Sequence, residues 1–190
     1  MFTDMAASSM FAEMFGARAA LKKRKRHNQL LVPIIARHRG ILVEAFGDSL
    51  LAVFDQPDDA ARCAISMQRK LTNYNETHPV EYPELEIHVR VGLHTGRLIL
   101  CRYDGQLEVA GQAVNVAARV EAGDHRKTDQ ILASEKTWNL LKPDRRFQFE
   151  PLPVLQARGI GDLALYRLKW RCSEQPERKF LTLSDEHRSA

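Results

Sequence analysis

The segment ILVEAFGDSLLAVF, residues 41–54, constrains the fold most strongly, because it predicts two strands joined by a tight turn. Both arms are rich in β-branched, aromatic and leucine side chains, which favour strands. The Gly47-Asp48 pair between them has the composition of a hairpin turn. An aspartate in a turn usually serves the local backbone, so Asp48 alone indicates no chemistry. A second carboxylate at a similar strand end would change that interpretation.

The hairpin lies in a chain whose helices and strands do not alternate regularly. We predict a strand at 1–5, a helix at 9–38 kinked at Pro33, a helix at 58–74, a strand at 87–93, a hairpin turning at Asp104-Gly105, a helix at 112–122, a strand at 130–133, a helix at 135–142 and two late strands. A doubly wound parallel sheet would require regular alternation. The order instead predicts an α+β fold, with a ferredoxin-like βαββαβ core, a mixed and mainly antiparallel sheet, and helices packed on one face.

Length and composition indicate one globular domain. With 190 residues, of which 44% are hydrophobic and 27% charged, the chain can bury a core. We expect the domain to span residues 1–168, with a first strand that looks truncated, and a polar tail at 169–190. No stretch of about 18 apolar residues and no cleavable leader is present, so we expect no membrane insertion. Cys63, Cys101 and Cys172 are widely spaced, which favours a reducing cytoplasm.

A second carboxylate, Asp4, ends the first predicted strand. In a split β-α-β sheet that strand lies beside the hairpin, so Asp4 and Asp48 are expected to meet at adjacent strand ends. Paired carboxylates can hold two Mg²⁺ ions about 3.5–4 Å apart, an arrangement used for in-line phosphoryl transfer. The pair therefore predicts a metal-dependent site for a phosphate ester.

Four strings resemble the catalytic domain of class III nucleotidyl cyclases, the adenylate and guanylate cyclases. They are FTDMAASS, ILVEAFGDSLLAVFDQPDDAARCA, VRVGLHTG and GQAVNVAARVEA, in this order, and the resemblance covers about residues 1–168. It implies that the ribose 3′-oxygen of a purine nucleoside triphosphate attacks the α-phosphate and expels pyrophosphate. It also implies that Asp4, Asp48 and the backbone carbonyl of Met5 bind two Mg²⁺ or Mn²⁺ ions.

The resemblance implies a phosphate-binding turn directly after the first strand. Backbone N–H groups of Ala6, Ala7, Ser8 and Ser9, which lead into a helix N-terminus, would hold the β- and γ-phosphates. Arg158 falls where the family has a lysine that grips the distal phosphates, and it keeps the positive charge. Ala7 departs from the family, which commonly has glycine there, and its Cβ is costly if φ is positive.

Asn115 and Arg119 are four residues apart in a predicted helix, so they project from one face. In the family that the chain resembles, the asparagine orients the ribose and the arginine stabilises charge on the α-phosphate. There the two come from a partner subunit, so the resemblance implies a head-to-tail homodimer with two equivalent active sites. The alternative interpretation is an exposed polar helix face that packs on Val114, Ala117 and Ala118.

Two glutamates at the implied base-recognition positions disagree about the substrate. Glu44, four residues before Asp48, resembles the guanylate cyclase residue, because a carboxylate accepts hydrogen bonds from guanine N1–H and the amino group. Glu108, three residues before Gly111, can accept from adenine N6 but opposes guanine O6. We favour ATP and cyclic AMP, because the resemblance is to single-domain bacterial members that mostly make cyclic AMP. A guanylate cyclase and a non-catalytic nucleotide-binding regulatory module are the alternatives.

The run KKRKRH, residues 22–27, is densely basic. On a helix its charges spread around the circumference, and no aromatic residue is interleaved. This pattern favours a solvated helix face over a nucleic-acid patch, so we expect no nucleic-acid partner.

Overall fold

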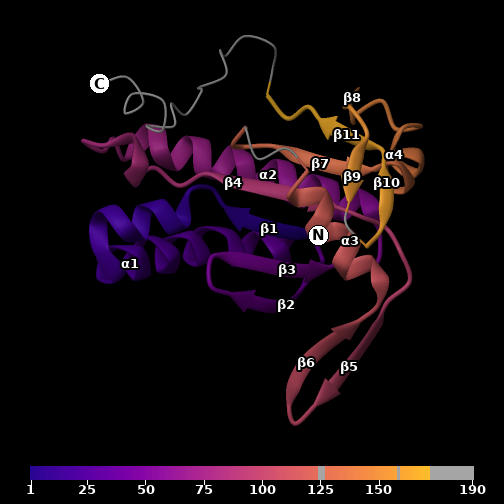
Figure 1. Cartoon of the computed structure of the whole chain (residues 1–190), viewed down its shortest axis with the longest axis horizontal. Coiled ribbons are helices and arrows are strands. Elements are labelled where there is room, and N and C mark those ends of the chain that lie inside the picture. The colour runs from indigo at the N-terminus through magenta and orange to yellow at the C-terminus, as the bar shows by residue number, and fades with distance from the viewer. Residues whose placement is uncertain (124–126, 158, 172–190) are drawn as a thin grey trace.

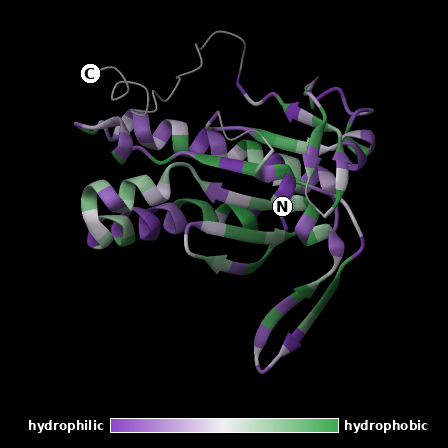
Figure 2. Cartoon of the chain, in the orientation of Figure 1, coloured by the Kyte–Doolittle hydropathy of each residue, from purple (hydrophilic) through white to green (hydrophobic). Residues whose placement is uncertain are grey.

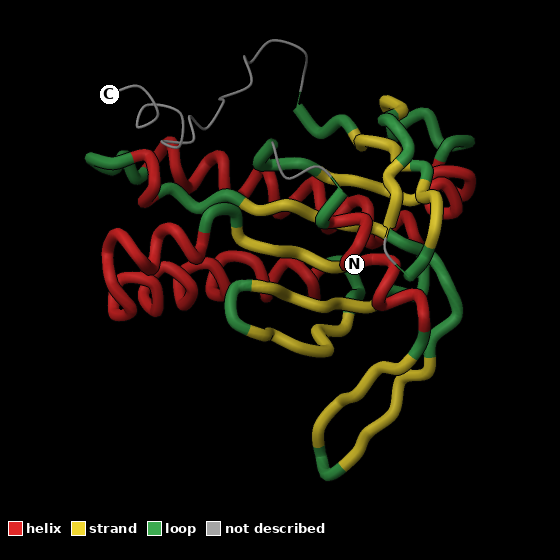
Figure 3. Tube along the Cα trace, viewed as in Figure 1, coloured by secondary structure: helices red, strands yellow, loops and turns green. Residues whose placement is uncertain are grey.

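The computed structural model describes residues 1–123, 127–157 and 159–171, and Figure 3 shows its helices and strands along the chain. The helices are α1 (Ser8–Arg37), α2 (Pro57–Thr77), the 3₁₀ helix η1 (Pro83–Leu85), α3 (Gln112–Glu121) and α4 (Glu135–Leu141). The strands are β1 (Phe2–Met5), β2 (Ile41–Phe46), β3 (Ser49–Val53), β4 (Val89–Leu93), β5 (Ile99–Tyr103), β6 (Gln106–Ala110), β7 (Ile131–Ser134), β8 (Phe149–Pro151), β9 (Leu155–Ala157), β10 (Gly161–Leu163) and β11 (Leu165–Leu168).

Seven strands form one mixed sheet in the order β2-β3-β1-β4-β7-β11-β8 (Figure 1). Neighbouring strands are antiparallel except β4 and β7, which are parallel. β1 lies between β3 and β4, so the β2–β3 hairpin adjoins the first strand. The predicted α+β fold with a mixed and mainly antiparallel sheet is therefore confirmed.

Helices cover both faces of the sheet, and the prediction of one covered face was wrong. On one face of β4, Val89 and Val91 join the main core, to which α1 and α2 contribute. On the other face Gly92 lies so close to α3 that a Cβ would come within 2.4 Å of Ala117 O. A smaller core on that side consists of Val116, Val120, Leu132 and Leu165. The two faces arise because successive side chains of a strand point to opposite sides.

The long helix α1 is broken near its start. Gly16 has φ 81° and ψ 164°, far from helical values, and glycine adopts positive φ at little steric cost. Pro33, where the sequence predicted the kink, lies inside the helix. The residue with non-helical backbone angles is thus a glycine in the third turn, so two helical segments meet at Gly16.

The β5–β6 hairpin projects away from the sheet (Figure 1), and Figure 2 shows hydrophobic residues along it. Ile99 is 68% exposed and Tyr103 is 71% exposed. β2, at the nearby edge of the main sheet, approaches β6 and carries Phe46 at 77% exposure. These strands therefore leave large apolar side chains in solvent, as surfaces that bind a partner do.

The chain returns to the main core after the last strand. Trp170 packs on that core, and its Nε1–H donates to Asp129 O at 2.7 Å. Residues 172–190, most of the predicted tail, lie outside the described residues. Within the part of the chain that is described, no helix combines the length and apolar character needed to cross a bilayer.

Candidate metal and nucleotide site

Asp4 is held near the middle of the sheet by two side-chain donors. The strand register places Asp4 opposite Arg90 in β4. Arg90 Nη2 donates to Asp4 Oδ2 at 2.8 Å, and Ser49 Oγ donates to Asp4 Oδ1 at 2.8 Å. Because Ser49 directly follows Asp48, the structure places the two predicted metal carboxylates at adjoining strand ends.

Arg90 links Asp4 to a buried acid on α3. Its Nε donates to Glu121 Oε1 at 2.7 Å, and the side chains of Arg90 and Glu121 are only 13% and 6% exposed. Burial raises the pKa of Glu121, Arg90 opposes that rise, and the charges of Asp4 and Asp48 add to it. Both carboxylates thus act on the same buried group, so they share one electrostatic neighbourhood.

Sequence reasoning missed Ser49, Arg90 and Glu121. Arg90 could have been found, because it is the charged residue at an outward position of the strand whose inward positions are Val89 and Val91. Its partners could not, since no local pattern shows that β4 pairs with β1. The three residues orient Asp4 and leave lone pairs of its carboxylate available.

Asp48 is half-buried in the turn between β2 and β3, and within the described residues it makes no hydrogen bond or ion pair. Carboxylate and carbonyl oxygens are the ligands that Mg²⁺ and Mn²⁺ prefer. Asp4, Asp48 and the carbonyl of Met5, at the end of β1, therefore fit a hard divalent cation. The described residues hold no cluster of three or more His, Cys, Asp or Glu side chains placed for a metal, so water and substrate phosphates would complete the coordination.

The predicted phosphate-binding turn has one unsuitable member. The N–H of Ala6 donates to His88 O at 2.9 Å and so belongs to the β1–β4 pairing. The N–H groups of Ala7, Ser8 and Ser9 precede the donor Phe11 N, which bonds to Ala7 O at 3.0 Å. They are therefore among the unpaired donors of a helix N-terminus, which suit an anion.

Ala7 itself adopts the conformation that favours glycine. Its φ is 56° and its ψ is 27°, in the left-handed region, where a Cβ crowds the backbone. The departure from the family glycine thus carries a steric cost. The turn keeps its shape with alanine because the strand before it and the helix after it fix the backbone on both sides.

Asn115 and Arg119 lie on the solvent face of α3. The helix buries Ala113, Val116 and Val120 on its other side. Within the described residues neither Asn115 nor Arg119 has a hydrogen-bond or ion-pair partner, and neither contacts Asp4 or Asp48 through one. One chain therefore presents these two side chains outward and does not join them to its own carboxylates.

Glu44 on β2 and Glu108 on β6 are both exposed and have no polar partner within the described residues. The pairing of β2 with β3 shifts register between Leu42 and Glu44, and β2 approaches β6. The two glutamates therefore lie on neighbouring strands. Arg158, the predicted distal-phosphate residue, lies outside the described residues.

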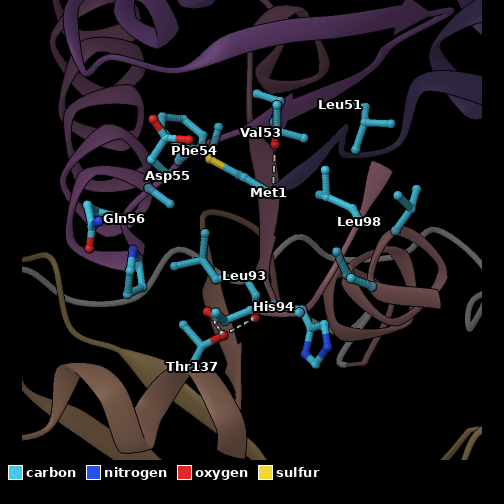
Figure 4. A pocket seen from close by; sticks show the side chains of 18 residues that line it. Met1, Leu51, Val53, Phe54, Asp55, Gln56, Leu93, His94, Leu98 and Thr137 are labelled. Carbon is cyan, nitrogen blue, oxygen red and sulfur yellow. Dashed lines mark hydrogen bonds between the residues drawn. The ribbon is translucent and has the colours of Figure 1, made fainter. Parts of the chain in front are cut away.

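A separate hollow lies at the opposite end of β1 (Figure 4). It is lined by residues that include Met1, Val53, Leu93, His94 and Thr137. Its polar groups bond internally: the Met1 ammonium donates to Ala52 O at 2.9 Å, and Thr137 Oγ1 contacts Leu93 O at 3.4 Å. None of the predicted site residues lines it, so this hollow is not the candidate active site.

Two aspartates thus lie at adjoining ends of a mixed sheet, beside a helix N-terminus, as the sequence predicted. The family described as adenylate and guanylate cyclase catalytic domain matches residues 1–170, nearly all of the described chain. The chain belongs to this family, as the four sequence strings indicated.

Known relatives support the family and differ widely in overall length. Adenylate cyclase 1 of Rhizobium meliloti is 26% identical over 171 residues, which are 84% of this chain and 25% of that protein. The serine/threonine-protein kinase pkn2 of Myxococcus xanthus is 32% identical over 152 residues, 79% of this chain and 17% of that protein. The chain thus spans a quarter or less of these two relatives.

A solved adenylate cyclase of Trypanosoma brucei, in its monomeric state, has the same fold. The TM-score is 0.75 at 19% identity, with 94% of this chain and 93% of that chain covered. At this identity the similarity establishes the fold alone.

Proposed function

We propose that this cyclase-family chain converts ATP to cyclic AMP and pyrophosphate in a head-to-tail homodimer. The observation that carries the proposal is the pair Asp4 and Asp48, held at one end of the sheet beside the free N–H groups of the α1 N-terminus. The ribose 3′-oxygen forms a bond to the α-phosphorus, and the bond from that phosphorus to the pyrophosphate oxygen breaks. The hydroxyl proton passes to solvent.

Asp4, Asp48 and the Met5 carbonyl would hold two Mg²⁺ or Mn²⁺ ions, whose chemistry is to acidify the ribose hydroxyl and offset phosphate charge. The N–H groups of Ala7, Ser8 and Ser9 would bind the distal phosphates. Arg90 keeps Asp4 oriented through its hydrogen bond. These groups all come from one chain.

Asn115 and Arg119 would come from the partner subunit, to orient the ribose and stabilise charge on the α-phosphate. Support comes from their exposure and lack of partners, since a side chain used across an interface stays unpaired in one protomer. The exposed apolar residues Phe46, Ile99 and Tyr103 supply surface for such an interface. We place the reaction in the cytoplasm, where ATP and GTP are available.

The choice of ATP rests on Glu108, which can accept from adenine N6, and on the Rhizobium relative named as an adenylate cyclase. Glu44 favours the second candidate, a guanylate cyclase, because it can accept from guanine N1–H and the amino group. Both glutamates are exposed and unpaired within the described residues, so both are free to meet a base.

The test is a product assay on the purified chain with ATP and with GTP, each with Mg²⁺ and with Mn²⁺. Cyclic AMP as the main product, absent from an Asp48→Ala preparation made in parallel, would support the proposal. Cyclic GMP as the main product would replace it with the guanylate cyclase. No cyclic product under any condition would favour a non-catalytic nucleotide-binding module.

A further inference from the structure

The basic run of α1 borders a groove that the proposed active site does not use. The groove, with a volume of about 540 Å³, lies between α1, the end of α2 and the segment that leads into β4. The lining residues that carry the argument are Lys22, Lys25, Arg26, Tyr74, His78 and Val80. None of these residues belongs to the candidate metal and nucleotide site. Asp4 faces Arg90 and α3, on the other face of the sheet from α1.

The groove carries an excess of positive charge. Lys22, Lys23, Lys25 and Arg26 line it, and Glu86 is the one carboxylate among its described lining residues. Glu86 Oε2 is 3.0 Å from His88 Nε2, so this carboxylate interacts with that histidine. The excess also follows from the sequence, because no Asp or Glu occurs between residues 14 and 43.

Two of the four cations are engaged in holding the groove together. Lys23 Nζ donates to Glu84 O at 2.6 Å and lies 4.3 Å from the centre of the Phe11 ring. The Arg26 guanidinium lies 5.9 Å from the centre of the Tyr74 ring. Lys22 and Lys25 are exposed and have no hydrogen-bond or ion-pair partner among the described residues. Like charges four residues apart on a helix, such as Lys22 and Arg26, repel each other and destabilise it. A bound anion would therefore lower this repulsion in α1.

The remaining lining is aromatic and apolar. Tyr74 and His78 stack with ring centres 4.3 Å apart and 21° between planes. Val80 is 41% exposed beside them, and Leu85 and Ile87 complete the wall. Asn75 ties the wall to α2, since its Nδ2 donates to Ile87 O at 3.0 Å and its Oδ1 accepts from Ile87 N at 3.1 Å. The apolar surface is thus preformed and borders the unpaired lysines, as in small-molecule sites.

We propose that this groove binds a phosphorylated organic molecule, with its phosphate on Lys22, Lys25 and Arg26 and its ring or apolar part against Tyr74, His78 and Val80. A lysine ammonium and an arginine guanidinium are the side-chain groups best suited to phosphate. The volume matches one small molecule, not an extended polymer. A soluble nucleoside monophosphate and a lipid phosphate share this chemistry, and the experiment distinguishes them.

The experiment measures binding to the intact chain in EDTA, which removes the divalent metal that the candidate active site needs. The probes are adenosine monophosphate, inorganic phosphate, and phosphatidylcholine vesicles with and without phosphatidic acid, at about 0.15 M salt. The test variant is the triple charge reversal K22E/K25E/R26E. The matched control is R37E/R69E/K70E, which makes the same change in charge at exposed helix positions outside the groove.

We expect one organic phosphate to bind at least about tenfold more tightly than inorganic phosphate. That binding should fall by about tenfold or more in the groove triple and should persist in the control triple. His78→Ala and Val80→Ser should weaken the organic phosphate and leave inorganic phosphate unchanged. Binding of adenosine monophosphate assigns a soluble ligand, and binding confined to phosphatidic acid vesicles assigns a lipid.

Three results would overturn the proposal. They are no saturable binding of any probe, equal binding by the groove triple and the wild type, and equal affinity for inorganic and organic phosphate. Tighter binding of a DNA duplex, lost in the groove triple alone, would assign the run to nucleic acid instead. Circular dichroism of each variant establishes that it is folded.

Discussion

The two groups of predicted site residues differ in how the chain holds them. Asp4 lies in an interior strand, with both carboxylate oxygens hydrogen-bonded and a buried Arg90–Glu121 pair behind it. Asn115 and Arg119 lie on an exposed helix face without partners in the described chain. A fixed carboxylate can meet a metal without reorganisation, whereas the exposed pair needs a second surface to define its position. The difference is what an active site shared between two chains would require.

The largest effect should come from removing either of the two proposed metal carboxylates. Asp48→Ala and Asp4→Ala should each lower kcat by on the order of 10³-fold or more, because each removes a metal ligand without opening the core. Asp55→Ala, at an exposed aspartate just after β3, is the control and should retain activity. Near-normal turnover of either variant at saturating metal would remove that carboxylate from the site.

The proposal that Arg119 acts in the active site of the partner subunit can be tested by complementation. Asp48→Ala and Arg119→Ala chains should each be inactive alone, and mixed dimers should hold one complete site. Random exchange makes half of the dimers mixed, so activity should recover to roughly a quarter of the wild-type value. The assay is run before and after subunit exchange, with mixed dimers quantified by differently tagged chains. Proven mixed dimers without recovered activity would contradict a shared site.

A smaller effect is expected at the base. A mismatched buried hydrogen-bonding group costs about 1–3 kcal/mol, so each glutamate should penalise one purine by roughly ten- to a hundredfold. Glu44→Lys should raise kcat/KM for ATP, since it supplies a donor to adenine N1. Glu108→Cys should shift preference toward GTP, since it removes the carboxylate that opposes O6.

The measurement for both variants is kcat/KM with each nucleotide. A wild type that strongly prefers GTP, together with lower ATP turnover in Glu44→Lys, would replace the adenylate cyclase with a guanylate cyclase. The comparison of the two glutamates thus decides the substrate independently of the metal carboxylates.

The smallest effect concerns the turn between β1 and α1, where Ala7 has a left-handed backbone. Ala7→Gly should raise the free energy of unfolding by about 1 kcal/mol, because glycine removes the Cβ from a left-handed backbone. Ala36→Gly, at an exposed position inside α1, should lower it by about 1 kcal/mol and serves as the matched control. Urea unfolding measures both. Equal destabilisation by the two glycines would show that the turn is not strained.

Local sequence patterns predicted the strands up to β7, the hairpin at Gly47-Asp48 and the meeting of Asp4 with that hairpin. They predicted two strands after α4, where the structure has the four strands β8, β9, β10 and β11. They failed where the outcome depends on pairing between distant segments. The coverage of the second face by α3 depends on Gly92, whose missing side chain admits the helix backbone. The links from Arg90 to Asp4 and Glu121 join residues that are 86 and 31 positions apart. The break in α1 followed backbone freedom at Gly16, whereas the prediction relied on the known cost of a helical proline.

The central position of β1 has a consequence for synthesis on the ribosome. This strand is made before its two neighbours in the sheet, β3 and β4, in which Leu51 and Gly92 pair with Phe2. Until both have left the exit tunnel, the nascent chain carries a strand with open hydrogen-bonding edges, which favour aggregation. The polar and basic α1, which is local and can form early, follows that strand directly. Chaperone demand should therefore be highest before residue 92 emerges, and the candidate metal site can form only after that point.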